Sequence, residues 1–298
     1  MNYEIGYEKM ELWLSFLAKR NRKDMTIKSY RSVIRSLIGF LNAEGRECDP
    51  ERIGEEDIYH FIRNYIATEN TVHQYITVMG IWLSYWRNPV LSGMGLLWND
   101  SGHPNAKWVE EYELRKMVAN CRTPTERLIL TLGARCGCRC DEMSRLRDRD
   151  FDGASLTVYG KGHGNGKVRI IPLTESIASE IATYIGQKED MKNGRKDRSD
   201  GRLLIKLVGK NYVNVMQTNM IYLTVKDIAA RSGVSCTTHS LRRFFATNTA
   251  KHTDLKNVQT LMGHSNINTT ARYLRRDPNE LRKAMEEADM SFYISAER

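Results

Sequence analysis

Residues 88–106 interrupt the hydrophobic pattern of the chain and so set its domain organisation. This stretch contains Pro89, Pro104 and three glycines among polar and small residues. Proline and glycine clusters of this kind are typical of loops and linkers. A chain of 298 residues is long enough for two domains of ordinary size. We therefore predict an N-terminal domain over residues 1–88, a linker over residues 89–106 and a C-terminal domain over residues 107–298.

The N-terminal domain is predicted to be a helical bundle. Apolar residues recur at helical spacing over about residues 7–19, 26–43, 54–65 and 70–87. Asp24 is a candidate cap for the second of these helices. Beside the apolar face of that helix, Lys28, Arg31 and Arg35 form a basic stripe. Such a stripe is typical either of a solvated helix edge or of a surface that binds phosphates, and the pattern leaves both open.

The C-terminal domain is predicted to be mainly α-helical with a small β-hairpin. Helical patterns cover about residues 110–120, 124–133 and 176–188, and a last helix starts near Pro278. Residues 156–159 and 168–171 alternate as strands do and are joined by a segment with four glycines. This hairpin lacks the G-x-x-x-x-G-K-[ST] pattern and leads into a strand, which argues against ATP binding. Residues 187–202 are nearly all charged or small, and we expect an exposed loop there.

The charge distribution points to a polyanionic partner for the C-terminal domain. The net charge is +9 and the isoelectric point is about 9.2. Residues 1–98 contain 12 basic and 12 acidic residues, so the whole excess lies in the remaining chain. A basic excess is typical of proteins that bind nucleic acid, although it also promotes solubility. No run of 18 apolar residues and no signal peptide are evident, so we expect a cytoplasmic protein without a membrane span.

The cysteine pattern does not predict a metal site. The six cysteines are Cys48, Cys121, Cys136, Cys138, Cys140 and Cys236. Three of them follow one another at every second residue, which is not the C-x-x-C spacing of zinc ribbons, and no second Cys/His pair completes the set. We therefore expect reduced thiols and no bound metal.

Residues 239–273 concentrate the side chains that are suited to chemistry. His239 and Arg242 are three residues apart, so on a helix they share a face. His264 follows a glycine, as is common at a turn, and Tyr273 lies nine residues further on. No carboxylate cluster accompanies them. This combination favours a negatively charged substrate that is held by cations and attacked by an oxygen nucleophile.

The order of these residues resembles that of the tyrosine recombinases, the phage-integrase and Xer-like family. H-x-x-R at His239 is followed by L-M-G-H, which ends at His264, and then by Tyr273. Upstream, Gly137-Cys-Arg-Cys-Asp-Glu142 resembles the first arginine box of the family, and Gly160-Lys161-Gly162 resembles its lysine hairpin. The resemblance implies a SAM-like core-binding helical domain followed by an α+β catalytic domain. It also implies a site-specific DNA recombinase, or integrase, that needs neither metal nor ATP.

The resemblance also implies a role for each residue of these boxes. Arg139 and Arg242 would hold the scissile phosphate, because paired guanidinium groups suit its developing charge. Tyr273 would attack the phosphorus and form a 3′-phosphotyrosine ester, and Lys161 would protonate the departing 5′ oxygen. His239 would act as an acid or base near the nucleophile. His264 would donate to the phosphate, and Glu142 would support the site by orienting a histidine or an arginine.

The implied partner is double-stranded DNA. A recombination site with inverted repeats would be bound by a homotetramer in the synapse, whereas the protein would be a monomer in solution. We expect Lys28, Arg31, Arg35 and Arg243 to contact the DNA, and the linker to let the two domains close around it.

Several alternatives remain open at this point. Arg135 lies four residues before Arg139 and would share its helix face, and Lys167 is a second lysine in the hairpin. Residues 224–235 resemble the helix-turn-helix of bacterial repressors, with Ala229 and Gly233 at the turn, which is typical of a non-enzymatic regulator. A type IB topoisomerase would use the same chemistry to relax DNA without exchanging partners.

Overall fold

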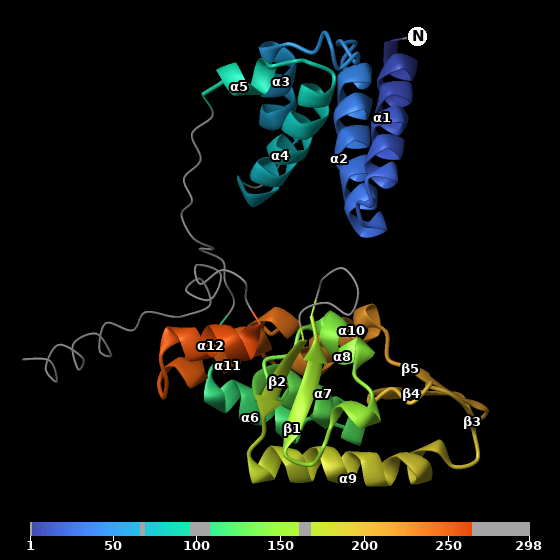
Figure 1. Cartoon of the computed structure of the whole chain (residues 1–298), viewed down its shortest axis with the longest axis vertical. Coiled ribbons are helices and arrows are strands. Elements are labelled where there is room, and N and C mark those ends of the chain that lie inside the picture. The colour runs from blue at the N-terminus through green and yellow to red at the C-terminus, as the bar shows by residue number, and fades with distance from the viewer. Residues whose placement is uncertain (1, 66–68, 96–107, 161–167, 264–298) are drawn as a thin grey trace, which may run out of the picture. The chain divides into compact units, whose positions relative to one another are not determined.

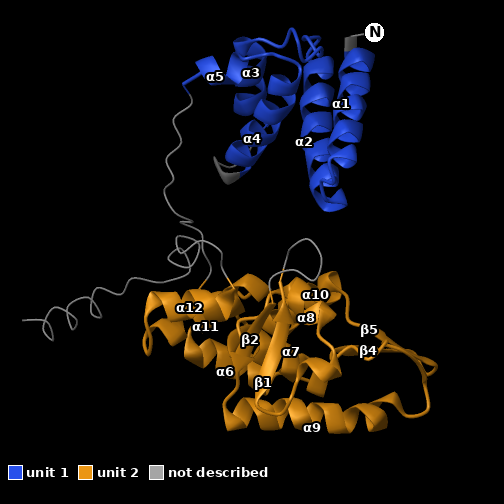
Figure 2. Cartoon of the chain, in the orientation of Figure 1, with its two compact units in different colours: residues 1–100 blue, residues 101–298 orange. Residues whose placement is uncertain are grey.

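The computed structural model describes residues 2–65, 69–95, 108–160 and 168–263 (Figure 1). The chain divides into two compact units, residues 1–100 and residues 101–298 (Figure 2). Three of the predicted catalytic residues, Lys161, His264 and Tyr273, lie outside the described residues. Within the described ranges, no helix is both long and apolar enough to cross a membrane.

Unit 1 is helical, as its apolar periodicity predicted. Its helices are α1 (Asn2–Lys19), α2 (Asp24–Ala43), α3 (Glu55–Tyr65), α4 (Glu69–Tyr85) and the short α5 (Val90–Gly93). Asp24 was predicted as the cap of α2 but is its first helical residue, and the preceding Lys23 has the extended backbone of an N-cap. The four predicted helices are confirmed, although α1 begins five residues earlier than its pattern indicated.

The core of unit 1 is built around large aromatic side chains. Trp13, Trp82 and Phe61 are fully buried, and the ring of Trp13 stacks on Tyr30 with centroids 5.6 Å apart. Each aromatic side chain of this size removes a large apolar area from water, so a few of them stabilise a small helical unit.

The N-terminal part of the predicted linker packs with unit 1 instead. The buried Asn88 side chain donates to the carbonyls of Pro50 and Ile53, both at 2.8 Å, and accepts from the backbone N–H of Val90 at 3.0 Å. Met94 is also buried in this core. The proline and glycine content indicated a break in the helical pattern. It did not show that backbone polar groups here are hydrogen-bonded to a buried side chain. Residues 96–106 of the predicted linker lie outside the described residues.

The described part of unit 2 combines helices with two small sheets. Its helices are α6 (Glu111–Ala119), α7 (Pro124–Ala134), α8 (Cys140–Arg145), α9 (Glu175–Lys192), α10 (Thr218–Arg231), α11 (Thr238–Ala250) and α12 (Leu255–Met262), with a 3₁₀ turn at Asp148–Asp150. The predicted hairpin is confirmed as β1 (Ser155–Tyr159) antiparallel to β2 (Val168–Pro172). A second sheet has the order β3 (Lys196–Arg198), β5 (Tyr212–Val215), β4 (Ile205–Val208), with β3 parallel to β5.

The prediction of a loop over residues 187–202 was wrong, whereas most of these residues are exposed, as predicted. Helix α9 continues to Lys192, and residues 196–198 form β3. Lys188 is 2% exposed, and its ammonium donates to both carboxylate oxygens of Asp148 at 2.7 Å and to the carbonyl of Arg202 at 2.7 Å. A buried charge is tolerated only when it is paired and hydrogen-bonded, as it is here. Composition alone could not reveal these partners.

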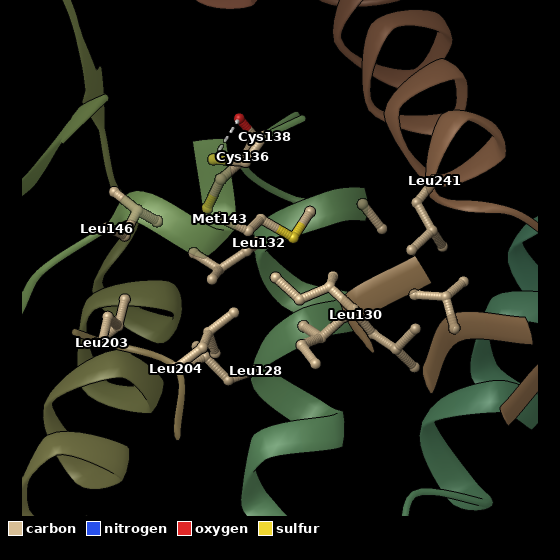
Figure 3. Close-up of a cluster of buried hydrophobic side chains, with 14 of the residues drawn as sticks. Leu128, Leu130, Leu132, Cys136, Cys138, Met143, Leu146, Leu203, Leu204 and Leu241 are labelled. Carbon is tan, nitrogen blue, oxygen red and sulfur yellow. Dashed lines mark hydrogen bonds between the residues drawn. The ribbon is translucent and has the colours of Figure 1, made fainter. Parts of the chain in front are cut away.

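Helix α7 is central to the core of unit 2. Thr123 caps its first turn by accepting from the backbone N–H of Glu126 at 3.1 Å, and Pro124 takes the first helical position. Figure 3 shows the leucines of α7 in one cluster with Met143 of α8 and Leu241 of α11. Gly133 allows α7 and α11 to approach closely, because a Cβ atom there would lie 2.9 Å from Cδ1 of Leu241.

Gly137 makes the turn that ends α7 and leads into α8. Its φ of +62° is in the left-handed region, and a Cβ atom at this position would lie 2.4 Å from Cδ1 of Phe245. The turn also corrects an expectation about Arg135 and Arg139. Arg135 ends α7 whereas Arg139 precedes α8, so the two do not share a helix face. Arg135 instead donates to Glu180 at 3.2 Å.

The candidate helix-turn-helix is part of the scaffold. Helix α10 runs without a break through Ala229, which was predicted to lie at the turn, and the chain reverses only at Gly233. Ile221, Val225 and Ile228 of α10 are fully buried in the core. A helix whose apolar face is used by the core of its own domain stabilises that domain, and the repressor-like pattern therefore has a structural explanation.

Replacing Gly137 by Ala is expected to destabilise the protein more than replacing Gly233 by Ala. The two glycines have similar φ angles, +62° and +65°, so both substitutions introduce the same backbone strain of about 1 kcal/mol. Only at Gly137 would the new methyl group meet Phe245, which adds roughly 1–3 kcal/mol of overpacking. Urea unfolding of the two variants measures the difference. Equal losses of stability would contradict the role assigned to the contact with Phe245.

Candidate active site

The carboxylate of Glu142 is the centre around which the described part of the site is arranged. Glu142 lies in the first turn of α8, and its side chain is 1% exposed. Its Oε2 accepts from the backbone N–H of Arg139 at 2.7 Å, and its Oε1 accepts from Nη1 of the same residue at 2.7 Å. Glu142 therefore fixes both the backbone and the guanidinium of Arg139, whose side chain is 27% exposed.

A second arginine binds Glu142 from the β-hairpin. Nη1 of Arg169 donates to Oε1 at 2.9 Å, and Nη2 donates to Oε2 at 2.8 Å. This bidentate geometry matches the planar guanidinium to the carboxylate. The strand pattern over residues 168–171 includes Arg169 but predicted no role for it. The strand alternation could have indicated that Arg169 is buried, because it occupies the same face of β2 as the buried Ile171.

The third arginine, Arg242, connects all the helical parts of the site. It lies in α11 with its side chain 1% exposed. Its Nη1 donates to the carbonyl of Gly137, and its Nη2 donates to the carbonyl of Met262 at the end of α12. Nη1 also lies 3.8 Å from Oε2 of Glu142. Arg242 thus links the turn before α8, helix α11 and the last turn of α12.

The electrostatics of this cluster favour an anionic ligand. Three guanidinium groups surround one carboxylate. Burial by itself raises the pKa of Glu142, but the hydrogen bonds and charge of Arg169, the backbone N–H of Arg139 and the charge of Arg242 together lower it to about 2. Glu142 is therefore ionised at neutral pH, and the cluster keeps a positive excess. A preorganised positive cluster of this kind is suited to stabilise a phosphate that gains charge during reaction.

His239 and Arg243 lie near Arg242 on α11. His239 is exposed in the first turn of the helix, one turn before Arg242. Arg243 is partly buried. The side-chain oxygen of Thr237 caps this turn by accepting from the backbone N–H of Ser240 at 3.2 Å, which fixes the start of the helix that carries these residues.

Described residues that flank two of the undescribed segments lie at the same cluster. Strand β2 resumes immediately after the hairpin tip that contains Lys161 and carries Arg169 as its second residue. Helix α12 ends at Gly263, one residue before His264, and a Cβ atom at Gly263 would lie 3.0 Å from Cδ of Arg169. The roles of Lys161, His264 and Tyr273, and of the rival Lys167, stay predictions.

The predicted DNA-binding residues of unit 1 line one surface hollow. Lys28, Arg31 and Arg35 border it together with Tyr7 and two serines. Arg31 is not fully available to a phosphate, because its Nε and Nη2 donate to the two oxygens of Glu11 at 3.0 Å and 2.6 Å. The sequence pattern showed the basic stripe but not this intramolecular ion pair.

The cysteines near the site are unsuited to hold a metal as they stand. Burial raises the pKa of Cys138 to about 12 and that of Cys140 to about 11, so both are neutral thiols at pH 7. Cys136 and Cys138 are both buried on either side of Gly137 (Figure 3). Among the residues that the structure describes, no group of three or more His, Cys, Asp and Glu side chains could hold a metal ion.

Comparison with known proteins gives a consistent assignment. The phage integrase family matches residues 107–280. Tyrosine recombinase XerA of Pyrococcus horikoshii is 25% identical over 280 residues, which cover 93% of this chain and 79% of that protein. Tyrosine recombinase XerC of Caldanaerobacter subterraneus is 33% identical over 167 residues, which cover 55% of this chain and 44% of that protein.

Solved structures share the fold. The XerH site-specific recombinase bound to a palindromic difH substrate has a TM-score of 0.68 at 20% identity, covering 89% of this chain and 80% of that one. A lambda integrase dimer bound to a COC′ core site has a TM-score of 0.66 at 17% identity, covering 90% and 95%. The match to the phage integrase family covers more than half of this chain. The chain therefore belongs to that family and is a tyrosine recombinase.

Proposed function

We propose that this protein recombines specific DNA sites by cleaving and rejoining strands through a 3′-phosphotyrosine intermediate. The observation that carries this proposal is the cluster of Arg139, Arg169 and Arg242 around the buried Glu142. Such a cluster supplies preorganised positive charge at the place where residues of the recombinase boxes meet. The relatives named as tyrosine recombinases support the same reaction.

In this mechanism Arg139 and Arg242 bind the scissile phosphate. The Tyr273 oxygen attacks phosphorus as it loses its proton, and His239 is the proposed acid or base beside it. The bond from phosphorus to the 5′ oxygen breaks, and Lys161 donates the proton that this oxygen needs, while His264 donates to the phosphate. Because the phosphotyrosine ester keeps the bond energy, a 5′-hydroxyl of a second strand can later displace the tyrosine without ATP.

We infer that the substrate is duplex DNA with inverted repeats, bound by unit 1 and unit 2 together. Unit 1 would contact the backbone through Lys28 and Arg35, and unit 2 would add Arg243. The XerH and lambda integrase structures with bound DNA support this assignment of the partner. A homotetramer in the synapse, a monomer before DNA binding and action in the cytoplasm complete the proposal.

A type IB topoisomerase-like activity is the second candidate, because it would use the same phosphotyrosine chemistry. The relatives favour recombination, since they are named as recombinases. Supercoiled DNA that carries two candidate sites distinguishes the two activities. A recombinase forms joined recombinant products, whereas relaxation without exchange of flanking sequences would favour the topoisomerase.

Replacing Tyr273 by Phe is expected to abolish the covalent protein–DNA adduct while leaving DNA binding intact. The substitution removes the nucleophilic oxygen and preserves the ring. A nicked suicide substrate traps the adduct, which is then detected by SDS gel electrophoresis. The matched control is Tyr293→Phe, which removes another C-terminal phenol. An adduct that survives Tyr273→Phe and disappears in Tyr293→Phe would move the nucleophile to Tyr293.

Replacing Glu142 by Gln is expected to slow DNA cleavage about 100-fold, the usual scale for losing one positioned donor to the reacting phosphate. Without the carboxylate, Arg139 loses its fixed position and Arg169 becomes a buried, unpaired charge. Glu180→Gln is a suitable control, because Glu180 also accepts from an arginine, Arg135, at 3.2 Å but lies outside the cluster. Equal cleavage rates in the two variants would argue against a role for Glu142.

The stability supplied by Glu142 is expected to depend on pH. The pKa of its carboxyl falls from an ordinary 4.5 to about 2 in the folded protein. A lowered pKa gives stability that is fully present above pH 4.5 and is lost as the pH falls toward 2. The wild type should therefore exceed Glu142→Gln by about 3 kcal/mol at pH 7, and by much less at pH 2 to 3. Urea unfolding at both pH values measures this, and a constant difference would contradict it.

A further inference from the structure

Arg169 is a charged residue in a position where the strand pattern calls for an apolar one. In β2, Val168 and Ile170 are exposed, whereas Arg169 and Ile171 face the core. Arg169 is 9% exposed, and burying a guanidinium is costly unless it is paired with good geometry. An isoleucine would satisfy both the alternation and the preference for β-branched residues in strands. The charge at this position therefore needs an explanation beyond the stability of the hairpin.

Its contacts complete the hydrogen bonding of Glu142. A carboxylate offers about four lone-pair sites. Arg139 occupies one site on each oxygen, through its Nη1 on Oε1 and its backbone N–H on Oε2. Arg169 occupies the second site on each oxygen, through Nη1 and Nη2. The carboxylate is thus saturated by two arginines, although a third arginine lies close by.

That third arginine is Arg242, whose Nη1 lies 3.8 Å from Oε2 and so beyond hydrogen-bonding distance. If Arg169 were absent, two acceptor sites of a carboxylate that is 1% exposed would lose their donors. An unsatisfied buried carboxylate is unfavourable, so the guanidinium of Arg139, already bonded to Oε1, would turn further onto it, and that of Arg242 would be drawn toward it. Both of these groups are needed at the phosphate.

The other side of Arg169 packs on the end of α12. A Cβ atom on Gly263 would lie 3.0 Å from Cδ and 3.2 Å from Nη1 of Arg169. Gly263 has a φ of +63° and ends the helix whose last carbonyl, that of Met262, accepts from Arg242. The Arg169 side chain therefore packs against Gly263 while its Nη1 and Nη2 bind Glu142. Arg169 is therefore fixed in place rather than adaptable.

We propose that Arg169 is a positioning residue for phosphoryl transfer: it saturates Glu142 and so prevents this carboxylate from drawing Arg139 and Arg242 away from the scissile phosphate. The proposal rests on the proposed recombinase function. In this role Arg169, a residue of the hairpin, acts through Arg139 and Arg242. It does not act through the hairpin lysine, Lys161.

The test is single-turnover cleavage of a nicked suicide substrate at saturating DNA, with folding checked by thermal melting. Arg169→Met should lower the cleavage rate about 1,000-fold, because both Arg139 and Arg242 are displaced from the phosphate, while DNA affinity changes little. Arg169→Lys should have an intermediate cleavage rate, because one ammonium cannot reproduce the bidentate contact with Glu142. Lys188→Met is the matched control, because it also removes a buried, carboxylate-paired cation, one that contacts Asp148 instead of the cluster. It should cleave at the wild-type rate once folded.

A second substitution separates positioning from folding. Adding Glu142→Gln to Arg169→Met removes the unsatisfied carboxylate, so the double variant should cleave about tenfold faster than Arg169→Met alone, at the rate of Glu142→Gln alone. A double variant that is no faster, or a folded Arg169→Met that cleaves like the wild type, would overturn the proposal.

A modified substrate separates the arginines from the hairpin lysine. With sulfur in place of the 5′ bridging oxygen, the leaving group no longer needs a proton, so the rate of Lys161→Ala should recover and that of Arg169→Met should not. Recovery of Arg169→Met would show that Arg169 acts through Lys161, against the proposal. Failure of the wild type itself to form an adduct would instead refute the proposed function.

Discussion

The ion pair between Glu142 and Arg169 is the interaction on which the rest of the site depends. Both side chains are almost completely buried, so each would be strongly unfavourable without the other. Their pairing joins the β-hairpin to helix α8 and gives Arg139 a fixed partner at 2.7 Å. A buried ion pair of this kind adds little net stability compared with apolar residues. What it provides is a single arrangement of charges, which suits a site that must present positive groups to a phosphate.

The backbone of the site is set by equally local constraints. Gly137 turns the chain between α7 and α8 in a conformation that a side chain would strain, and it leaves room for Phe245. The same turn directs its carbonyl at Arg242, and Met262 supplies a second carbonyl from the end of α12. Packing between α7 and α11 through Gly133 holds these parts together. The core and the site are therefore built from the same few contacts.

Sequence reasoning was accurate where the signal is local. The helical periodicity of unit 1, the strand alternation of the hairpin and the H-x-x-R spacing on α11 all reflect geometry within a few residues. It failed where distant partners matter. The polar composition of residues 187–202 predicted an exposed loop, and most of these residues are exposed, yet Lys188 is buried against Asp148, 40 residues away. In the same way, the basic stripe predicted that Arg31 contacts DNA but could not show that its side chain also pairs with Glu11.

The sequence by itself determined the family, the order of the arginine, lysine, histidine and tyrosine boxes, and the existence of most helices and of the hairpin. These follow from residue identity and short-range spacing. Only the tertiary structure decided that Arg169 completes Glu142 across 27 residues and that Arg242 donates to Gly137 across 105 residues. The reason is physical: hydrogen-bond partners of buried charges are chosen by how separate elements pack, and no local pattern encodes that choice.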